Sequence, residues 1–227
     1  MSKIVKIIKS KATVRFMGAL LLLAAASFVT AETSSAVDKY HPLENYTVEY
    51  TMEGVNTGKK TQYSKQWGNL LCWVEVSELT MPGAPAQKRN EKVITYIEDG
   101  QQWIITINQD DNTGTRMKNP MFEGITAGMK DKTPKEFSEQ FMKQMGGKEI
   151  GEKTVNGEKC TEWEIMGGAK TCITPDQISV ESGMNMAGIS MKETAVKINR
   201  KDGGPKDICD PGDAKLKEID MSQMLGQ

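Results

Sequence analysis

The sequence predicts a mainly β (α+β) protein in which one helix covers an antiparallel sheet, and three observations support this class. Residues 46–53 alternate strictly between apolar and polar side chains, which is typical of a strand with one buried face. Asx-Gly pairs at 99–100 and 156–157 separate strand-like segments, as two-residue hairpin turns do. One segment alone, 134–145, has a convincing helical pattern.

The hairpin around residues 99–100 is the strongest local signal. Counting outward from a two-residue turn gives the cross-strand pairs Tyr96–Trp103 and Ile94–Ile105. Aromatic and β-branched pairs of this kind each stabilise a sheet by about 0.2–1 kcal/mol. We therefore expect this hairpin near the centre of the sheet.

The segment 146–186 is predicted to form three consecutive antiparallel strands, and its register bears on the disulfides. A two-residue turn at 167–168 would pair Trp163 with Cys172 and place Cys160 on the face opposite to Cys172. A disulfide between these two cysteines would then require a bulge or a wider loop. Four cysteines in an exported chain predict two disulfides, and three pairings stay open for Cys72, Cys160, Cys172 and Cys209.

A capping box predicts the start of the helix 134–145. Thr133 can cap it, and Glu136 stands three residues later. An apolar stripe follows from three residues spaced by four, Phe137, Phe141 and Met145. The preceding segment, 108–132, lacks regular signals but carries scattered apolar residues, so we expect a long loop that acts as a lid.

Further strands are expected where short apolar runs lie between turn signals. These runs occupy residues 60–67, 69–79, 176–182 and 188–200. The tail, 214–227, is predicted to form a last strand or a short turn of helix.

The chain divides into three parts by composition. Residues 1–31 have the pattern of a cleaved secretory signal peptide, with five basic residues, an apolar run and small residues before position 31. The alternative is an uncleaved anchor, but the apolar run 16–29 is shorter than the ~20 residues of a spanning helix. We expect a flexible leader over 32–44 and a single β-rich domain over 45–227.

Charge and cysteine content restrict the partners and the compartment. Removing 31 of the 227 residues leaves 196 residues with 24 Lys and Arg against 30 Asp and Glu, a formal net charge of −6. An acidic chain is a poor partner for nucleic acid. The signal peptide and the even number of cysteines predict a periplasmic protein.

No residue pattern points to an enzyme. His41 is the only histidine and lies in the expected leader, which argues against Ser-His-Asp and Cys-His catalysis. The cysteines lack the C-x-x-C spacing of zinc sites. Glu162 and Glu164 alternate along a strand as solvent-exposed residues do. We therefore expect no catalytic residues, no cofactor and no metal ligands.

Methionine is the anomaly in the composition, with 15 in the chain and 13 after residue 31. Thioethers can bind copper(I) in an exported protein. The favoured alternative is an adaptable apolar surface of flexible side chains, because the methionines are spread along the chain.

A family resemblance adds to this prediction. The run GGKEIGEKTVNGEKCTEWEI, followed by KTCITPDQISV, resembles uncharacterised exported bacterial proteins with the LolA-like fold of the periplasmic lipoprotein carrier. The terminal PKDICDPG segment is similar too. The resemblance implies a curved antiparallel half-barrel around a hydrophobic cavity, and a role in binding a lipid-like group. The arginines Arg89, Arg116 and Arg200 stand in no motif of that family.

These observations together predict a non-enzymatic periplasmic protein that binds or carries a lipid or a lipoprotein acyl chain in the concave face of its sheet. An envelope protein partner docking on a module with a self-filled core is the alternative, and methionine-based copper binding is a weaker one. The residues expected to contact a hydrophobic ligand are Ile94, Tyr96, Trp103, Ile105, Phe137, Phe141, Met145 and Trp163.

Overall fold

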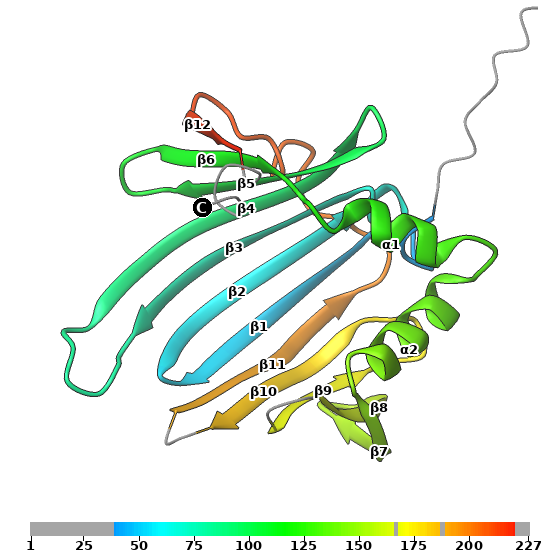
Figure 1. Cartoon of the computed structure of the whole chain (residues 1–227). Coiled ribbons are helices and arrows are strands. Elements are labelled where there is room, and N and C mark those ends of the chain that lie inside the picture. Colours follow the sequence, from blue (N-terminus) through cyan, green and yellow to red (C-terminus); the bar gives the residue numbers. More distant parts are fainter. Residues whose placement is uncertain (1–38, 166–167, 187–188, 221–227) are drawn as a thin grey trace, which may run out of the picture. The chain divides into compact units, whose positions relative to one another are not determined.

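The structure, a computed structural model, describes residues 39–165, 168–186 and 189–220. These residues belong to one unit of the chain, built on a single curved sheet (Figure 1). The predicted signal peptide, residues 1–31, lies outside the described residues. No helix among the described residues is long and apolar enough to cross a membrane.

Twelve strands of the described residues form the sheet, and two helices and a short 3-10 turn accompany them. The elements follow one another as β1 (Tyr46–Gly54), β2 (Asn56–Lys65), the 3-10 turn η1 (Gln66–Gly68), β3 (Leu70–Leu79), β4 (Gln87–Glu98), β5 (Gln101–Asn108), β6 (Thr113–Lys118), α1 (Phe122–Met129), α2 (Pro134–Gln144), β7 (Lys148–Val155), β8 (Glu158–Ile165), β9 (Ala169–Ile173), β10 (Ser179–Met186), β11 (Ile189–Asn199) and β12 (Lys215–Ile219).

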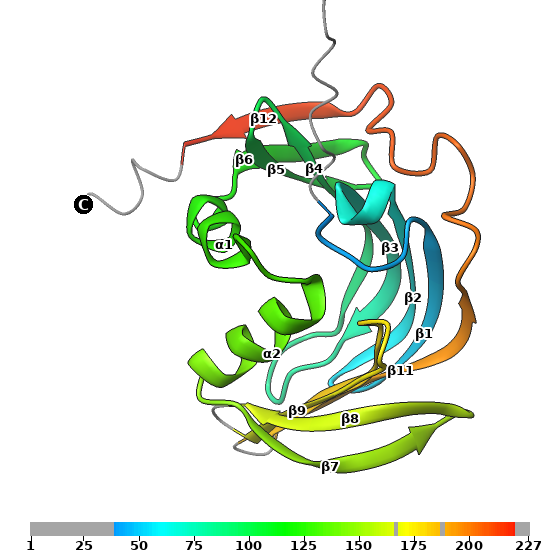
Figure 2. The same cartoon turned by 90° about the vertical axis from the view of Figure 1, so that its right-hand side faces the viewer.

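The sheet is open, with β12 and β7 at its edges and the order β12-β6-β5-β4-β3-β2-β1-β11-β10-β9-β8-β7. The mainly β class and the curved antiparallel sheet are confirmed, with one exception. β12 pairs with β6 in parallel, because the segment 200–214 crosses from β11 in the middle of the sheet to its far edge. Figure 2 shows this crossover segment on the convex side and both helices on the concave side.

Both predicted Asx-Gly hairpins are confirmed. Tyr96 pairs with Trp103 and Ile94 pairs with Ile105, as a two-residue turn requires. Asp99 and Gly100 both have positive φ angles, and so do the turn residues 156–157. Such angles favour Gly and Asn, which is why these turns could be recognised in the sequence.

The expectation of one long loop over 108–132 is wrong. This segment holds β6 and α1. The helix α1 has no side-chain cap at Met121 and contains Gly124 and Gly128, so the usual start signal and strong helix formers are missing. Packing stabilises it instead, since Phe122 is buried and its ring lies 5.8 Å from that of Tyr40.

Two neighbouring residues of β2 point to opposite faces, and their partners show which residues lie on each face of the sheet. Tyr63 pairs with Cys72 of β3, whereas Ser64 pairs with Tyr46 of β1. Cys72 packs with Cys209 of the crossover segment, so this face is the convex one. Tyr46 therefore points to the concave face, together with the alternate β1 residues Val48, Tyr50 and Met52.

The structure forms two disulfides, Cys72–Cys209 and Cys160–Cys172. The second corrects the predicted register, which had placed Cys160 and Cys172 on opposite faces. Cys172 pairs with Glu162 instead of Trp163, because three residues lie between the last β8–β9 pair, Ile165 and Ala169. A shift of one residue moves every side chain to the other face, so Cys172 lies on the same face as Cys160. Two disulfides indicate an oxidising environment.

The described part of the expected leader packs on the sheet. The amides of Tyr40 and His41 both donate to the Trp67 carbonyl at 2.9 Å, and Leu43 packs against the core that contains Tyr46. His41 itself is buried.

Candidate functional site

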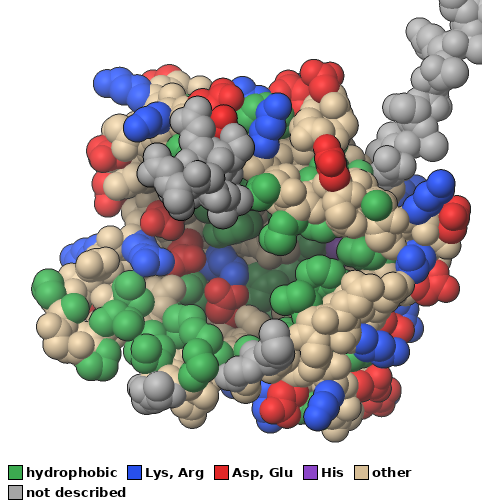
Figure 3. All heavy atoms as spheres, in the orientation of Figure 1, with side chains coloured by type: hydrophobic (Ala, Val, Ile, Leu, Met, Phe, Trp, Pro, Cys, Tyr) green, Lys and Arg blue, Asp and Glu red, His purple; other side chains and the backbone are tan. Residues whose placement is uncertain are grey.

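The concave face carries an apolar cavity where β10 and β11 pair with each other, which we call the methionine cavity. Its volume is about 300 Å³, which is at the lower limit of ordinary ligand pockets. Thioether side chains from three strands line it, those of Met52, Met184 and Met191. Figure 3 shows this face hollowed, with hydrophobic side chains around the hollow and a few acidic and basic side chains within it.

A second cavity, of about 270 Å³, lies beneath α2. The buried side chains of Met142 and Trp163 line it, and so do four charged residues, Lys135, Glu139, Glu149 and Glu152. The capping box of α2 is confirmed, since Thr133 and Glu136 bond to each other's backbone amides. This cap fixes the start of α2 over the cavity.

The two cavities adjoin along the sheet. Trp163 of the cavity beneath α2 is the cross-strand partner of Thr171, which lines the methionine cavity. The row of partners continues through Ser182 and Glu193 to Met52. Cross-strand partners share a face, so the row lies on the face covered by α2. We call the two adjoining cavities the concave groove.

The apolar stripe of α2 is only partly packed. Phe137 stacks on Phe141 with ring centroids 5.9 Å apart, and Phe137 also lies against Gly128 of α1. Phe141 and Met145 remain 42% and 44% exposed. Met142, which lies off this stripe, is the residue that α2 buries against the sheet. The face of α2 that lines the cavity beneath it is formed by Lys135, Ser138, Glu139 and Met142 instead.

An ion pair lies on the concave face beside the methionines. Lys60 of β2 pairs with Glu193 of β11, and the Lys60 ammonium lies 4.8 Å from the centroid of the Tyr50 ring. The Tyr50 hydroxyl donates to the Ser179 carbonyl at 2.9 Å, and burial raises the pKa of this phenol. Tyr50 therefore stays neutral, and Lys60 and Glu193 neutralise each other.

Asn56, a residue that lines the methionine cavity, has one buried polar atom without a partner among the described residues. Asn56 donates from Nδ2 to Glu75 Oε1 at 3.2 Å, and Ser77 donates to the same oxygen at 2.6 Å. Asn56 Oδ1 is buried and has no hydrogen-bond partner among the described residues. A buried carbonyl oxygen is stabilised by a donor, so a ligand hydroxyl, amide or ammonium that reached this atom would be favoured.

The eight residues predicted to contact a ligand do not form one surface. Trp163 lines the concave groove, whereas Phe137, Phe141 and Met145 line neither of its cavities. The other four lie on the convex face. Ile94 and Ile105 pack with Cys72 on that face. Tyr96 and Trp103 are two residues away from them along β4 and β5, so they point to the same face. The four convex residues are Ile94, Tyr96, Trp103 and Ile105.

Three of these four residues, Ile94, Tyr96 and Ile105, line a separate cavity of about 780 Å³ under the crossover segment. Leu70, Ile94 and Ile105 line its apolar side, and Asp207 and Asp210 of the crossover line the other. Lys65 and Lys92 donate to crossover carbonyls and, with the Cys72–Cys209 disulfide, fasten this segment to the sheet.

Trp103 lies outside the lining of the convex cavity and stacks instead with Arg116. The Arg116 guanidinium carbon lies 3.8 Å from the Trp103 ring centroid, and Arg116 Nη2 donates to Glu98 at 3.0 Å. Trp103 thus makes a cation–π contact with Arg116 of the same sheet.

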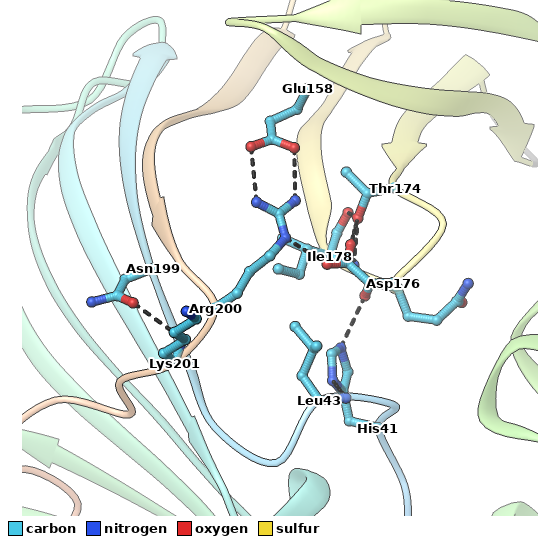
Figure 4. A network of polar contacts seen from close by, with 10 residues as sticks. His41, Leu43, Glu158, Thr174, Asp176, Ile178, Asn199, Arg200 and Lys201 are labelled. Carbon is cyan, nitrogen blue, oxygen red and sulfur yellow. Dashed lines mark hydrogen bonds and ion pairs between the residues drawn. The ribbon is translucent and has the colours of Figure 1, made fainter.

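A network of ion pairs and hydrogen bonds lies near the start of β1 (Figure 4). Arg200 donates to both oxygens of Glu158, at 2.9 and 2.7 Å, and from Nε to Asp176 at 2.6 Å. Its hydrogen bonds lower the pKa of Glu158. Burial opposes the same effect at Asp176, but Arg200 and Thr174 still hold the pKa of Asp176 below its ordinary value. Every charge here is paired, so the network joins three segments and offers no reactive group.

His41 contacts the tip of the β9–β10 connection beside this network. Its Nδ1 accepts from the Leu43 amide at 3.1 Å, and its Nε2 lies 3.3 Å from the Gln177 carbonyl. Burial lowers the pKa of His41. The neutral ring with the proton on Nε2 satisfies both contacts, so His41 is a structural residue in this position.

The described part of the chain contains no cluster of three His, Cys, Asp or Glu side chains that could hold a metal ion. Both pairs of cysteines are oxidised.

No protein-family model and no curated protein matches this chain. Several solved structures are similar to it, among them the following three. An uncharacterized conserved protein from Thermus thermophilus is 12% identical, over 81% of this chain and 94% of that one, with a TM-score of 0.48. PNGF-II is 8% identical, over 79% of this chain and 31% of that one, with a TM-score of 0.45. A beta-barrel-like protein of the domain of unknown function DUF1849 from Brucella abortus is 10% identical, over 71% of this chain and all of that one, with a TM-score of 0.39. At these values they assign no function, and the LolA-like resemblance stays a prediction.

The sequence contains a partial signal for the residues that were missed. The strict alternation of 46–53 places Met52 with the core face of β1, and the high methionine content drew attention to thioethers. Met184 and Met191 could not be joined to Met52 from the sequence, because the pairing of β1 with β11 is not local.

Proposed function

We propose that this protein is a non-enzymatic binding protein of an oxidising compartment, the periplasm, and that it holds a hydrophobic ligand such as a lipid acyl chain in the concave groove. The observation that carries the proposal is the methionine-lined cavity, which adjoins the cavity beneath α2 on the same face of an open sheet. Flexible thioether side chains adapt to ligands of different shape.

The energetics support an acyl ligand. Each buried methylene contributes about 0.8 kcal/mol, so burying about ten methylenes contributes about 8 kcal/mol before the costs of ordering the ligand.

The polar atoms of the groove favour one kind of head group. Asn56 Oδ1 accepts no hydrogen bond from the described residues, and Glu193 is already paired with Lys60. A hydroxyl, amide or ammonium donor on the ligand would satisfy Asn56 without leaving a charge unpaired. The ligand class is therefore a lipid with a hydrogen-bond donor close to its apolar part.

A filled-groove variant tests the proposal. Ser182→Phe adds an aromatic ring inside the methionine cavity, whereas Ser190→Phe adds the same ring at an exposed position of β11. The probe is 1-N-phenylnaphthylamine, whose fluorescence rises in apolar surroundings, with palmitate as competitor. We expect Ser182→Phe to weaken probe binding at least about tenfold, which is a loss of about 1.4 kcal/mol. Equal binding by both variants, or no binding by the parent protein, would overturn the proposal.

The exposed stripe of α2 favours a second candidate, an interaction module for an envelope protein. Phe141 and Met145 are apolar and exposed, as residues of a binding surface often are. In this case Phe141→Gln with Met145→Gln would abolish partner binding and leave the binding of 1-N-phenylnaphthylamine unchanged. Loss of probe binding in this double variant would instead assign the stripe to the ligand site.

A further inference from the structure

We infer that Met52, Met184 and Met191 form a binding site for a soft monovalent cation of the copper(I) class. The three thioethers line one cavity of the concave groove. The inference shares this cavity with the proposed function but does not depend on lipid binding.

The register of three neighbouring strands places the three methionines close together on one face of the sheet. Met184 of β10 and Met191 of β11 are direct cross-strand partners, whose Cβ atoms lie about 4.5–5.5 Å apart in such pairs. Met191 is also the partner of Gly54, two residues after Met52 on β1. Met52 and Gly54 are on the same face, and Gly54 carries no side chain to separate Met52 from Met191.

Burial gives the three residues different roles. Met52 is 6% exposed and is held in the core, so it provides a fixed donor. Met184 and Met191 are half-buried and line the same cavity, so solvent reaches both of them. An ion can therefore enter between Met184 and Met191 and complete its coordination on Met52.

Thioether chemistry determines which ion the site would take. Soft sulfur donors select copper(I), whereas Ca²⁺ and Mg²⁺ require oxygen and Zn²⁺ prefers imidazole or thiolate. The described residues offer no competing cluster of such ligands. Both disulfides remove thiolates from competition, so methionine supplies the reduced sulfur available in this cavity.

Three charged residues line the cavity, Glu193, Lys192 and Lys170. Glu193 lines the same cavity and pairs with Lys60. Lys192 also lines the cavity, but its ammonium is 2.9 Å from Glu181. Lys60 and Lys192 are thus each neutralised by a carboxylate, whereas Lys170, which also lines the cavity, makes no ion pair among the described residues.

Copper(I) titration of the full exported chain in competition with bicinchoninate tests the inference. Leucine keeps the volume and the apolar character of methionine but removes the sulfur, so Met184→Leu with Met191→Leu is the decisive variant. Met121→Leu is the matched control, because Met121 is exposed at the start of α1. Native mass spectrometry with Ag⁺ as a redox-stable probe gives the stoichiometry.

We expect one copper(I) per chain with a dissociation constant below about 1 μM, and affinity weakened at least about tenfold in the double variant. Met121→Leu should bind like the parent protein. Absence of submicromolar binding by the parent, or equal affinity in the double variant, would overturn the inference.

Probe binding separates this inference from the proposed function. The double leucine variant should still bind 1-N-phenylnaphthylamine, because its cavity stays apolar. Copper(I) binding without probe binding would reject the lipid proposal and keep the metal site. Probe binding without copper(I) binding would reject the metal site alone.

Discussion

Cys72 of β3 and Cys209 of the crossover segment are joined by a disulfide although 137 residues separate them in the sequence. Both cysteines are buried on the convex face, with Ile94 and Ile105. The bond fastens the segment that carries the chain to the parallel edge strand β12. It is on the face opposite to the concave groove, so its removal should change stability without changing ligand binding.

Replacing Cys72 and Cys209 together by Ala should lower the free energy of unfolding by about 2–5 kcal/mol, because the unfolded chain regains the freedom of a long loop. Urea denaturation measures this loss. The affinity for 1-N-phenylnaphthylamine in the absence of urea should stay that of the parent protein. A tenfold loss of affinity in this variant would place the ligand on the convex face instead.

Arg200→Lys should lower stability by about 1 kcal/mol, although it keeps the positive charge. Lysine cannot make the two parallel bonds that Arg200 makes to Glu158 together with the bond to Asp176. Roughly a third of each side chain is exposed, so solvent screening limits the effect. Thermal unfolding of Lys197→Met, which removes an exposed ion pair with Glu49, is the control and should show no measurable change.

The same network should make stability fall in acid. The pKa values of Glu158 and Asp176 are lowered in the folded protein, so the unfolded chain binds more protons as the pH falls. Their contribution is complete above the ordinary carboxyl pKa values of about 4 and is lost as the pH falls through the lower folded values. The free energy of unfolding, measured by urea denaturation from pH 5 to pH 2, should therefore fall less steeply with decreasing pH in Arg200→Met than in the parent protein.

His41 should add a second pH dependence at higher pH. Burial lowers its pKa in the folded protein, and the unfolded chain takes up a proton near pH 6.5. The contribution of His41 to the free energy of unfolding is therefore complete above about pH 6.5 and is lost as the pH falls below that value. His41→Gln can keep both contacts and does not titrate, so this slope should vanish in it. An unchanged slope between pH 7 and pH 5 would show that another group is responsible.

Thr133→Ala should loosen α2. Loss of the capping box costs about 1 kcal/mol of helix stability, so amide hydrogen exchange in 134–144 should be roughly fivefold faster. Thr126→Ala in α1 is a matched control, because the Thr126 hydroxyl bonds to helix carbonyls and caps no amide. Equal acceleration of α2 in both variants would show that the cap does not hold this helix.

Local turn chemistry made much of the fold predictable. The pair Asp99 and Gly100 sets its hairpin register by itself, and so does the turn at 156–157. The β8–β9 connection was misjudged because Gly167 and Gly168 resemble a two-residue turn, whereas the pair Ile165–Ala169 encloses three residues. The parallel strand β12 depends on a distant partner, and no local signal encodes it.

The site was less predictable, because alternation shows which residues share a face but not which face is concave. Ile94 and Ile105 were grouped correctly with each other, yet the crossover segment covers them. The α2 stripe was recognised from its spacing of four, but Met142 is the residue that contacts the sheet. The concave groove exists through the pairing of β1 with β11, which joins residues more than 130 positions apart.

Native mass spectrometry of the exported protein, purified without detergent, is the sharpest test of a lipid in the concave groove. We expect a co-purifying lipid, bound one to one in the parent protein and absent from Ser182→Phe, with Ser190→Phe retaining it. A parent protein of ligand-free mass that gains no thermal stability when palmitate is added would show that the groove holds no such ligand.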